Sequence, residues 1–208
     1  MSCSRARARA AETPPARRRR ALSHLVAFDD APFPREHRGD VPVVGAVWAR
    51  DRFEGFLAGA VRRDGANATA VLATLVRESR FAPQLGLILL EGLALAGFNV
   101  VDLPRLAAAS GCAVLAVARR PSDQRALRAA LRDRVPGGRA KWARVERAGA
   151  QEPCAGLWVQ RAGLTLAEAE RALAPHLGPG RLPAPLRLAH LAAGLLAVGR
   201  RGRRGWLY

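Results

Sequence analysis

The chain has 208 residues, of which 50% are hydrophobic, so it can form one domain around an apolar core and is not disordered throughout. Its formal net charge is +17 at neutral pH, but seven arginines and Glu12 give residues 1–20 a charge of +6, and four arginines at 200–204 add +4. The remaining body carries +17 − 10 = +7, which favours a phosphate-bearing partner over an acidic protein surface. Lys141 is the only lysine, and this preference for arginine reflects in part a GC-rich genome.

The cysteines and the apolar runs bear on the cellular compartment. Cys3, Cys112 and Cys154 are odd in number and widely spaced, as is usual in a reducing compartment, and they lack metal-ligand spacing. The basic start leads into only one short apolar run at 22–28, and the apolar stretch at 186–198 is too short to span a bilayer. We therefore expect a cytoplasmic protein without a membrane segment.

Three segments differ in composition. Residues 1–20 consist largely of Arg, Ala and Pro without an apolar period, so we predict a disordered, arginine-rich arm, which either contacts nucleic acid or is a solvated start. Residues 21–199 contain the regular patterns and are predicted to form a single domain. Residues 200–208 are expected to form a basic C-terminal tail.

The first half of the domain is predicted to be rich in strands. A strand at 22–28 is followed by two more at 41–48 and 53–61, joined as a hairpin. A helix at 67–81, with Asn67 as a plausible cap, comes next. The short, continuous apolar run at 85–90 is typical of a strand buried on both faces.

The second half alternates between helices and strands. The predicted elements are a helix at 103–110, a strand at 112–118, a helix at 121–134 with a proline start, a strand at 156–160, and helices at 165–176 and 185–198. Thr165 and Glu168 have the spacing of a capping box. Three leading strands followed by this alternation predict an α/β fold with a mixed sheet.

Polar side chains end two of the apolar runs. Asp29 and Asp30 follow the first run, and Glu91 follows the run at 87–90. A carboxylate at the end of a buried strand projects into a cleft while the strand fixes its backbone, and hard cations such as Mg²⁺ prefer such oxygen ligands. A third segment, at 181–190, ends at His190. The order of the three segments along the chain favours a metal-dependent nuclease.

That order resembles endonuclease V, and more closely the uncharacterised endonuclease V-like family called domain of unknown function ninety-nine. The resemblance runs from about 22 to about 199, and its most specific stretches are FDDAPF at 28–33, EGLALAGFNVVD at 91–102 and RLPAPLRLAH at 181–190. The Gly-Phe-Asn signature at 97–99 points to the uncharacterised family, while the Pro-x-Pro-x-Arg-x-Ala-His segment at 183–190 is shared with endonuclease V. The resemblance implies a ribonuclease H-like sheet flanked by helices.

The resemblance implies roles for three residues. Asp29 matches the first-strand aspartate that binds metal in endonuclease V, Glu91 matches the aspartate that ends its central strand, and His190 matches a histidine of its last helix. Adjacent strand residues face opposite sides, so only one of Asp29 and Asp30 can share a cleft with Glu91. The alignment favours Asp29, and Asp30 is expected to brace the following proline-rich turn. The alternatives from the residues alone are turn chemistry for the two aspartates, a strand end emerging into solvent for Glu91 and a core histidine for His190.

The chain also departs from endonuclease V. The glutamate that begins the helix after the hairpin is replaced by Asn67, and Asp64 is the nearby carboxylate that could complete the metal site. The aromatic-proline wedge is absent, and Phe98 and Asn99 stand in place of a base-pocket segment. Inosine specificity is therefore not expected. Phe98 and Asn99 could stack on and hydrogen-bond a base, or Phe98 could pack into the core at a glycine-enabled turn.

Two further residues complete the candidate site. Asp102 begins a helix, where a carboxylate favours the N-terminus, so we interpret it as a cap first and a site residue second. Arg187 is a candidate phosphate contact. The leading hypothesis is a nuclease in which Asp29 and Glu91, with Asp64 or Asn67, hold Mg²⁺ or Mn²⁺ and His190 supports catalysis on DNA or RNA. The alternatives are a nucleic-acid-binding module that has lost cleavage and a protein-interaction subunit.

Overall fold

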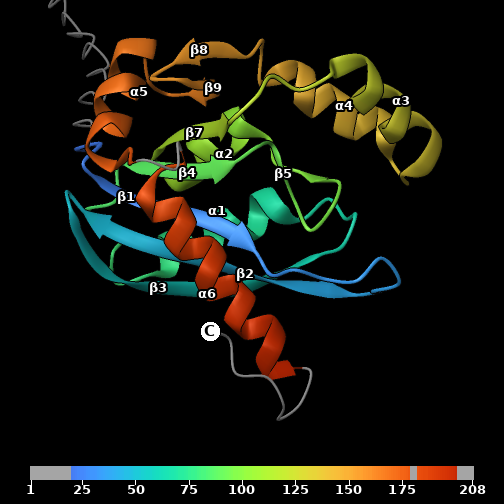
Figure 1. Ribbon diagram of the computed structural model, residues 1–208, viewed down its shortest axis with the longest axis horizontal. Helices are drawn as coiled ribbons and strands as arrows, with labels where there is room; N and C mark the ends of the chain where they lie inside the picture. The colour runs from blue at the N-terminus through green and yellow to red at the C-terminus, as the bar shows by residue number, and fades with distance from the viewer. Residues whose placement is uncertain (1–19, 179–181, 201–208) are drawn as a thin grey trace, which may run out of the picture.

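The computed structural model describes residues 20–178 and 182–200, so nearly all of the predicted arm and tail lies outside the described residues. One mixed sheet organises the domain, with strand order β3-β2-β1-β4-β7-β9-β8, and helices cover both of its faces (Figure 1). The strands are β1 (His24–Asp30), β2 (Asp40–Ala49), β3 (Arg52–Arg62), β4 (Leu87–Glu91), β7 (Ala113–Ala118), β8 (Glu152–Cys154) and β9 (Leu157–Ala162). This arrangement confirms the predicted α/β fold with a mixed sheet.

The direction of the strands follows from their connections. The loop at 31–39 and the tight turn at 50–51 make β1, β2 and β3 an antiparallel meander, whereas β1, β4 and β7 run parallel at the centre. Parallel strands need crossovers, and these are provided by α1 (Ala68–Glu78) and α2 (Leu103–Ser110). The side chains of β4 from Leu87 to Leu90 are buried on both faces, as its continuous apolar run predicts.

Alternation along the strands divides the core into two large clusters. Even-numbered side chains of β1 and β4, such as Phe28 and Leu90, pack with α1 and α2. Odd-numbered side chains, such as Ala27 and Leu89, pack with α5 (Leu166–Leu173) and with the start of α6 (Ala184–Arg200). The face of the sheet toward which a strand residue points is therefore fixed by its parity.

A third, smaller cluster lies under a helical pair at one end of the molecule. The pair comprises α3 (Gln124–Arg134) and α4 (Gly138–Arg147), which pack on each other beside a two-stranded ribbon of β5 (Ala94–Leu95) and β6 (Asn99–Val100) (Figure 1). α4, β5, β6 and β8 were not predicted from the sequence. The predicted helix at 121–134 begins at Gln124 instead, because Asp123 caps it by accepting the Ala126 N–H at 2.9 Å.

Two other helix starts can be compared with their predictions. Thr165 and Glu168 form the predicted capping box at the start of α5, which a short 3₁₀ turn, η1 (Ala174–His176), follows. Asn67 occupies the N-cap position of α1, but its side chain makes no cap hydrogen bond. Among the described helices, none is both long and apolar enough to cross a membrane.

Candidate functional site

Asp29 and Glu91 lie at the carboxyl ends of adjacent parallel strands and on the same face of the sheet. The last paired residues of β1 and β4 are Phe28 and Leu90, and each carboxylate is the next residue along its strand. Both are odd-numbered, so they share the face that packs against α5 and α6. Neighbouring strands lie only about 4.8 Å apart. Two oxygen-donor side chains are therefore brought together from residues far apart in the sequence.

His190 joins this pair from α6. Its Nδ1 lies 2.8 Å from Asp29 Oδ2, and the Asp30 backbone N–H donates to Asp29 Oδ1 at 2.9 Å. The Asp29 side chain is only 14% exposed, whereas His190 is 64% exposed. When Nδ1 carries the proton that it donates to Asp29, the opposite ring nitrogen is left as an acceptor. The imidazole thus orients a nearly buried carboxylate at the edge of open solvent.

Asp30 points to the opposite face of the sheet, as strand alternation requires. Burial raises the pKa of Asp30 to about 6, and the nearby charge of Asp29 adds to this shift, while a hydrogen bond with the Ala96 backbone opposes it. Asp30 therefore contacts the loop at 96 rather than the side chain of His190. The two neighbouring carboxylates have different surroundings, and only Asp29 shares a face with Glu91.

Glu91 opens onto a groove beside α6. Its Oε1 lies 3.5 Å from the guanidinium of Arg119, which follows β7, and both side chains are partly exposed. The groove has a volume of about 850 Å³, and His190 and the exposed Arg187 also line it. In the described part of the chain, the Arg187 side chain forms no ion pair, so it can receive an external anion.

Aromatic side chains that the sequence reasoning missed line the same groove. Trp48 and Phe53 are paired across the β2–β3 hairpin, and their rings lie 6.4 Å apart. Phe53 and Phe56 are 40% and 47% exposed, with ring centroids 4.7 Å apart. Residues opposite each other in an antiparallel pair share a face, so the hairpin register is the signal that could have found this cluster.

The donor set fits a hard divalent cation only in a limited way. Asp29 and Glu91 offer oxygen ligands from one face, and Mg²⁺ needs few protein ligands because it retains waters. However, within residues 20–178 and 182–200, no three His, Cys, Asp or Glu side chains gather closely enough to hold an ion. Any ion at Asp29 and Glu91 would therefore complete its shell with water or phosphate oxygens.

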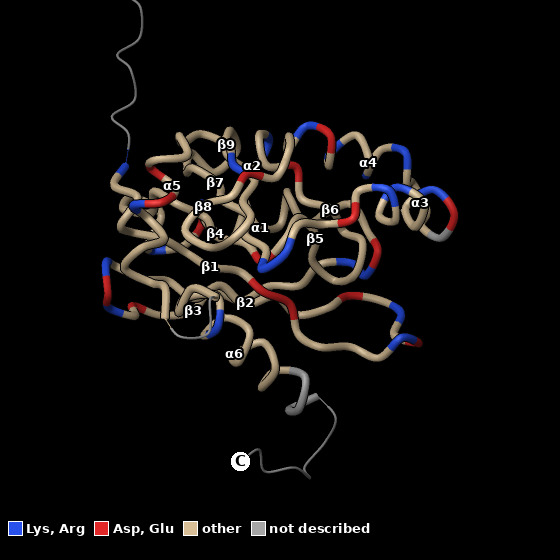
Figure 2. Tube along the Cα trace, turned by 45° about the horizontal axis from the view of Figure 1, so that its top comes forward, with Lys and Arg blue, Asp and Glu red and all other residues tan. Residues whose placement is uncertain are grey.

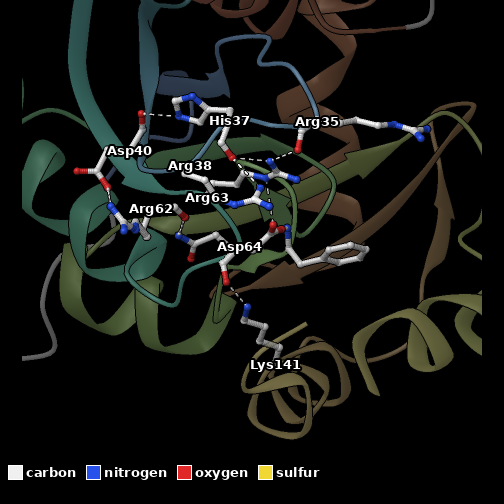
Figure 3. A network of polar contacts seen from close by, with 10 residues as sticks. Arg35, His37, Arg38, Asp40, Arg62, Arg63, Asp64 and Lys141 are labelled. Atoms are coloured by element: carbon white, nitrogen blue, oxygen red, sulfur yellow. Dashed lines mark hydrogen bonds and ion pairs between the residues drawn. The ribbon is translucent and has the colours of Figure 1, made fainter. Parts of the chain in front are cut away.

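Asp64, the expected third ligand, is not brought into a metal-binding group with these residues. Its Oδ1 accepts the Phe98 backbone N–H at 2.8 Å, and its Oδ2 lies 3.1 Å from Arg63 Nε. Lys141 Nζ donates to its backbone carbonyl (Figure 3). Gly97 has a φ of +84°, and a Cβ there would lie 2.4 Å from Asp64 Oδ1. Asp64 therefore braces the turn at 97–98, which explains its absence from the site.

Asn67 and Asn99 form a second structural bridge. Asn99 is fully buried, and its Nδ2 donates to the Arg62 carbonyl at 2.8 Å and to Asn67 Oδ1 at 2.7 Å. Its Oδ1 accepts the Ala68 N–H at 3.0 Å, so Asn99 caps α1 in place of Asn67. Asn67 Oδ1 also accepts the Arg62 N–H at 3.0 Å. Asn99 is thus engaged inside the protein, and the amide oxygen of the exposed Asn67 is already bonded to Asn99 and to the Arg62 backbone.

The remaining two residues of the predicted site also have structural surroundings. Phe98 is half-buried against the third cluster under α3 and α4, as the alternative of a glycine-enabled turn anticipated. Asp102 caps α2 by accepting the Arg105 N–H at 3.2 Å, and it pairs with Arg147 at 2.7 Å. Burial raises the pKa of the Asp102 carboxyl, but the hydrogen bonds from Arg147 and Arg105 outweigh this effect, so the net shift is downward. Asp102 is thus the cap that the sequence predicted.

Known proteins match the chain over most of its length. The model of a family described as endonuclease dU matches residues 22–197. A UPF0215 protein of Deinococcus radiodurans is 55% identical over 178 residues, which cover 86% of this chain and 91% of the relative. A UPF0215 protein of Methanothermobacter thermautotrophicus is 35% identical over 182 residues, covering 84% and 88% of the two chains.

Solved structures agree with this relationship. A protein of unknown function from Archaeoglobus fulgidus is 34% identical, with a TM-score of 0.77 over 83% of this chain and 97% of that chain. Human endonuclease V is 13% identical, with a TM-score of 0.54 and 87% coverage of both chains. Endonuclease V of Ciona intestinalis, in complex with DNA containing an inosine followed by a ribo-adenosine, is 12% identical, with a TM-score of 0.53 over 86% and 87%. The fold is thus the ribonuclease H-like fold of endonuclease V, and the chain belongs to the endonuclease dU family.

Proposed function

We propose that this chain is a metal-dependent endonuclease that hydrolyses phosphodiester bonds in DNA or RNA. The observation that carries the proposal is the placement of Asp29 and Glu91 on one face at adjacent strand ends, with His190 hydrogen-bonded to Asp29. The description of the family, endonuclease dU, makes deoxyuridine-containing DNA the first substrate to test. The altered base-pocket segment continues to argue against inosine specificity.

The side chains have different proposed roles at the scissile phosphate. Asp29 and Glu91 would hold Mg²⁺ or Mn²⁺, which supplies an activated water and neutralises charge on the phosphate. His190 keeps the Asp29 carboxylate in one orientation, and its exposed ring nitrogen faces solvent, where it can accept a proton from the attacking water. Arg119 and Arg187 line the groove and can pair with the phosphates on either side.

The groove favours a strand with unpaired bases. Trp48, Phe53 and Phe56 give it aromatic surfaces beside two arginines, which is the combination that single-stranded nucleic acid binds. Nucleic acid is therefore the proposed partner. We place the protein in the cytoplasm, because the two described cysteines, Cys112 and Cys154, are both free thiols.

A second candidate function is a nucleic-acid-binding module without cleavage. It is favoured by one observation: Asp64 and Asn67 are engaged in bracing the fold, and no three-residue metal group forms among the described residues. Such a module would keep the groove and its arginines but would bind Mn²⁺ weakly.

The test is a cleavage assay with Mn²⁺ on single-stranded, duplex, deoxyuridine-containing and inosine-containing DNA and RNA. We expect wild-type protein to cut at least one unpaired substrate and Asp29→Asn to lose at least a hundredfold in rate, a typical loss for a group that acts in the transition state. Asp40→Asn, which replaces an exposed carboxylate at the start of β2 that does not line the groove, is the matched control and should retain activity.

Metal affinity separates the two candidate functions. An enzyme with a working site should gain thermal stability in millimolar Mn²⁺, and Asp29→Asn should abolish that gain. Binding of oligonucleotide without cleavage, and without a Mn²⁺ effect on melting, would favour the binding module and reject the enzyme.

A further inference from the structure

A second pocket lies between α3 and α4, the helical pair at the end of the molecule opposite α5 (Figure 1). Its volume is about 380 Å³. The residues that line it are three arginines, one tryptophan and one glycine, namely Arg128, Arg132, Gly138, Arg139 and Trp142. No residue of the groove beside α6 belongs to this pocket.

The helical repeat explains why these side chains converge. Arg128 and Arg132 are four residues apart, so they share one face of α3, and Arg139 and Trp142 are three apart on α4. Gly138 lets the helices approach closely, because a Cβ there would lie 1.8 Å from the Leu131 carbonyl oxygen. Basic positions recur along both helices (Figure 2).

The arginine side chains of this pocket have different interaction partners. Arg132 pairs with Asp133 at 2.6 Å, while Trp142 Nε1 donates to Glu146 at 2.6 Å, so both nearby carboxylates have partners. Arg128 stacks over the Trp142 ring at 5.3 Å. A stacked guanidinium uses its face and leaves its N–H edges for an anion.

The pocket is held rigidly against the domain. Lys141 Nζ donates to the Asp64 carbonyl (Figure 3), Arg144 donates to the Val100 carbonyl at 2.9 Å, and Arg147 pairs with Asp102. Burial lowers the pKa of the Lys141 ammonium, because the side of α4 that faces the body removes this cation from water. These three contacts anchor α4 to the body of the domain, and with it the backbone positions of Arg139 and Trp142.

We propose that this pocket binds the phosphodiester backbone of a nucleic-acid strand, as an anchoring site separate from the proposed cleavage site. Arginine N–H edges match phosphate oxygens in pairs, and Trp142 offers an aromatic surface for the adjoining sugar or base. The inference rests on the proposed function only in taking nucleic acid as the ligand. Arg119 of the groove precedes α3 in the chain by a short connection.

The test measures binding of a labelled single-stranded oligonucleotide in EDTA, where cleavage is blocked, at several salt concentrations. For Arg128→Ala/Arg139→Ala we expect roughly a tenfold loss of affinity. The slope of log K against log salt concentration should become less negative by about 1.4, at about 0.7 for each of the two phosphate contacts removed. Arg77→Ala/Arg105→Ala removes the same charge from exposed positions of α1 and α2 and should leave the slope nearly unchanged. Circular dichroism checks that all variants stay folded.

The outcomes separate the possible ligands. Equal losses in the two double variants would mean that only net charge matters, and they would overturn the site. If the pocket variant loses binding of inorganic phosphate but keeps the oligonucleotide affinity of the control, the ligand is a free phosphate and the proposal fails. A wild-type protein that binds the oligonucleotide through this pocket but never cleaves it would reject the proposed enzyme and leave the anchoring site standing.

Discussion

At the scale of single residues, the hydrogen bonds that a polar side chain already makes determine whether it can serve as a ligand. Asp29 and Glu91 pair with the exposed side chains of His190 and Arg119, whereas Asp64, Asn67 and Asn99 hold backbone groups of neighbouring segments. A sequence shows which residues can bind a metal or a base, but not which of them the fold already uses. This difference reduces the predicted site to the pair Asp29 and Glu91, with His190 beside it.

His176 gives a pH dependence that can be measured. It is buried edge-on against Trp48, with ring centroids 5.9 Å apart, and burial lowers the pKa of its imidazole although Asp51 opposes the shift. The unfolded chain therefore binds a proton that the folded state excludes, so stability should decrease as the pH falls below about 6.5, the ordinary value. The raised pKa of Asp30 gives the opposite pH dependence over the same range. The contribution of His176 is therefore measured as the difference between wild type and His176→Gln in urea unfolding at pH 5, 6 and 7.5, and this difference should shift against the wild type as the pH falls.

The matched control for that experiment is His37→Gln, in which a histidine of an exposed turn is replaced. It should retain the wild-type pH dependence between pH 5 and 7.5. Identical pH profiles for wild type and His176→Gln would contradict the assignment, because the buried imidazole would then contribute nothing to proton uptake on unfolding.

Elements were predictable where hydrophobic periodicity dominates and were missed where turn residues interrupt it. The strands that become β1, β2, β3, β4 and β7 and the helices α1, α2, α5 and α6 stand out because their apolar residues repeat with a fixed period. The helix α4 was missed because Pro136, Gly137 and Gly138 read as a loop, although Gly138 is required by the close approach to α3. β5 and β6 are two-residue strands that no periodicity can signal.

Contacts between elements that are distant in the sequence could not be predicted either. Asn67 was the plausible cap of α1 by position, yet Asn99 supplies the hydrogen bond from the β5–β6 ribbon. The placement of Asp29 with Glu91 was accessible because parallel strands align their ends, and parity then selects Asp29 over Asp30. The aromatic lining of the groove required the register of the β2–β3 hairpin, which carries a bulge at Val47 and Trp48.

The Asn99 bridge should be one of the costliest polar contacts to remove. Asn99→Ala leaves the buried Ala68 N–H and the partly buried Arg62 carbonyl without their partner, and an unsatisfied buried group costs about 1–3 kcal/mol. We therefore expect a loss of about 2–4 kcal/mol in the free energy of unfolding, measured by urea denaturation.

A double-mutant cycle with Asn67→Ala tests the bridge itself. Because the two amides are bonded at 2.7 Å, their effects should be non-additive by about 0.5–3 kcal/mol. Strict additivity would mean that each asparagine acts alone, and it would return Asn99 to consideration as a group available to a base.

At the scale of the whole molecule, three features gather around the carboxyl ends of the parallel strands. Asp29 and Glu91 lie at the carboxyl ends of β1 and β4, Arg119 follows β7, and α6, which carries His190, crosses this face of the sheet (Figure 1). Open α/β sheets bind ligands at the carboxyl ends of their strands. The architecture thus collects oxygen donors, a cation and an imidazole from segments that span most of the domain.

The aromatic lining of the groove determines which form of nucleic acid can bind at this edge of the sheet. Phe53 and Phe56 are large apolar side chains held in solvent by the hairpin, and neither is needed to fill the core. Removing one aromatic platform typically costs about 1–3 kcal/mol per stacked base. Phe56→Ala should therefore weaken binding of single-stranded DNA by roughly five- to a hundredfold, with duplex binding and melting temperature little changed. Fluorescence anisotropy in EDTA measures the two affinities.

Leu195→Ala provides the comparison, because Leu195 is an exposed apolar residue of α6 that does not line the groove. Its affinity for single-stranded DNA should equal that of wild type. If Phe56→Ala and Leu195→Ala instead leave DNA binding intact and both shift the sedimentation coefficient, the apolar surface is a contact between copies of the chain. In that case the bases would have to be held elsewhere, since a partner covering Phe56 would also cover the groove that Glu91 and His190 line.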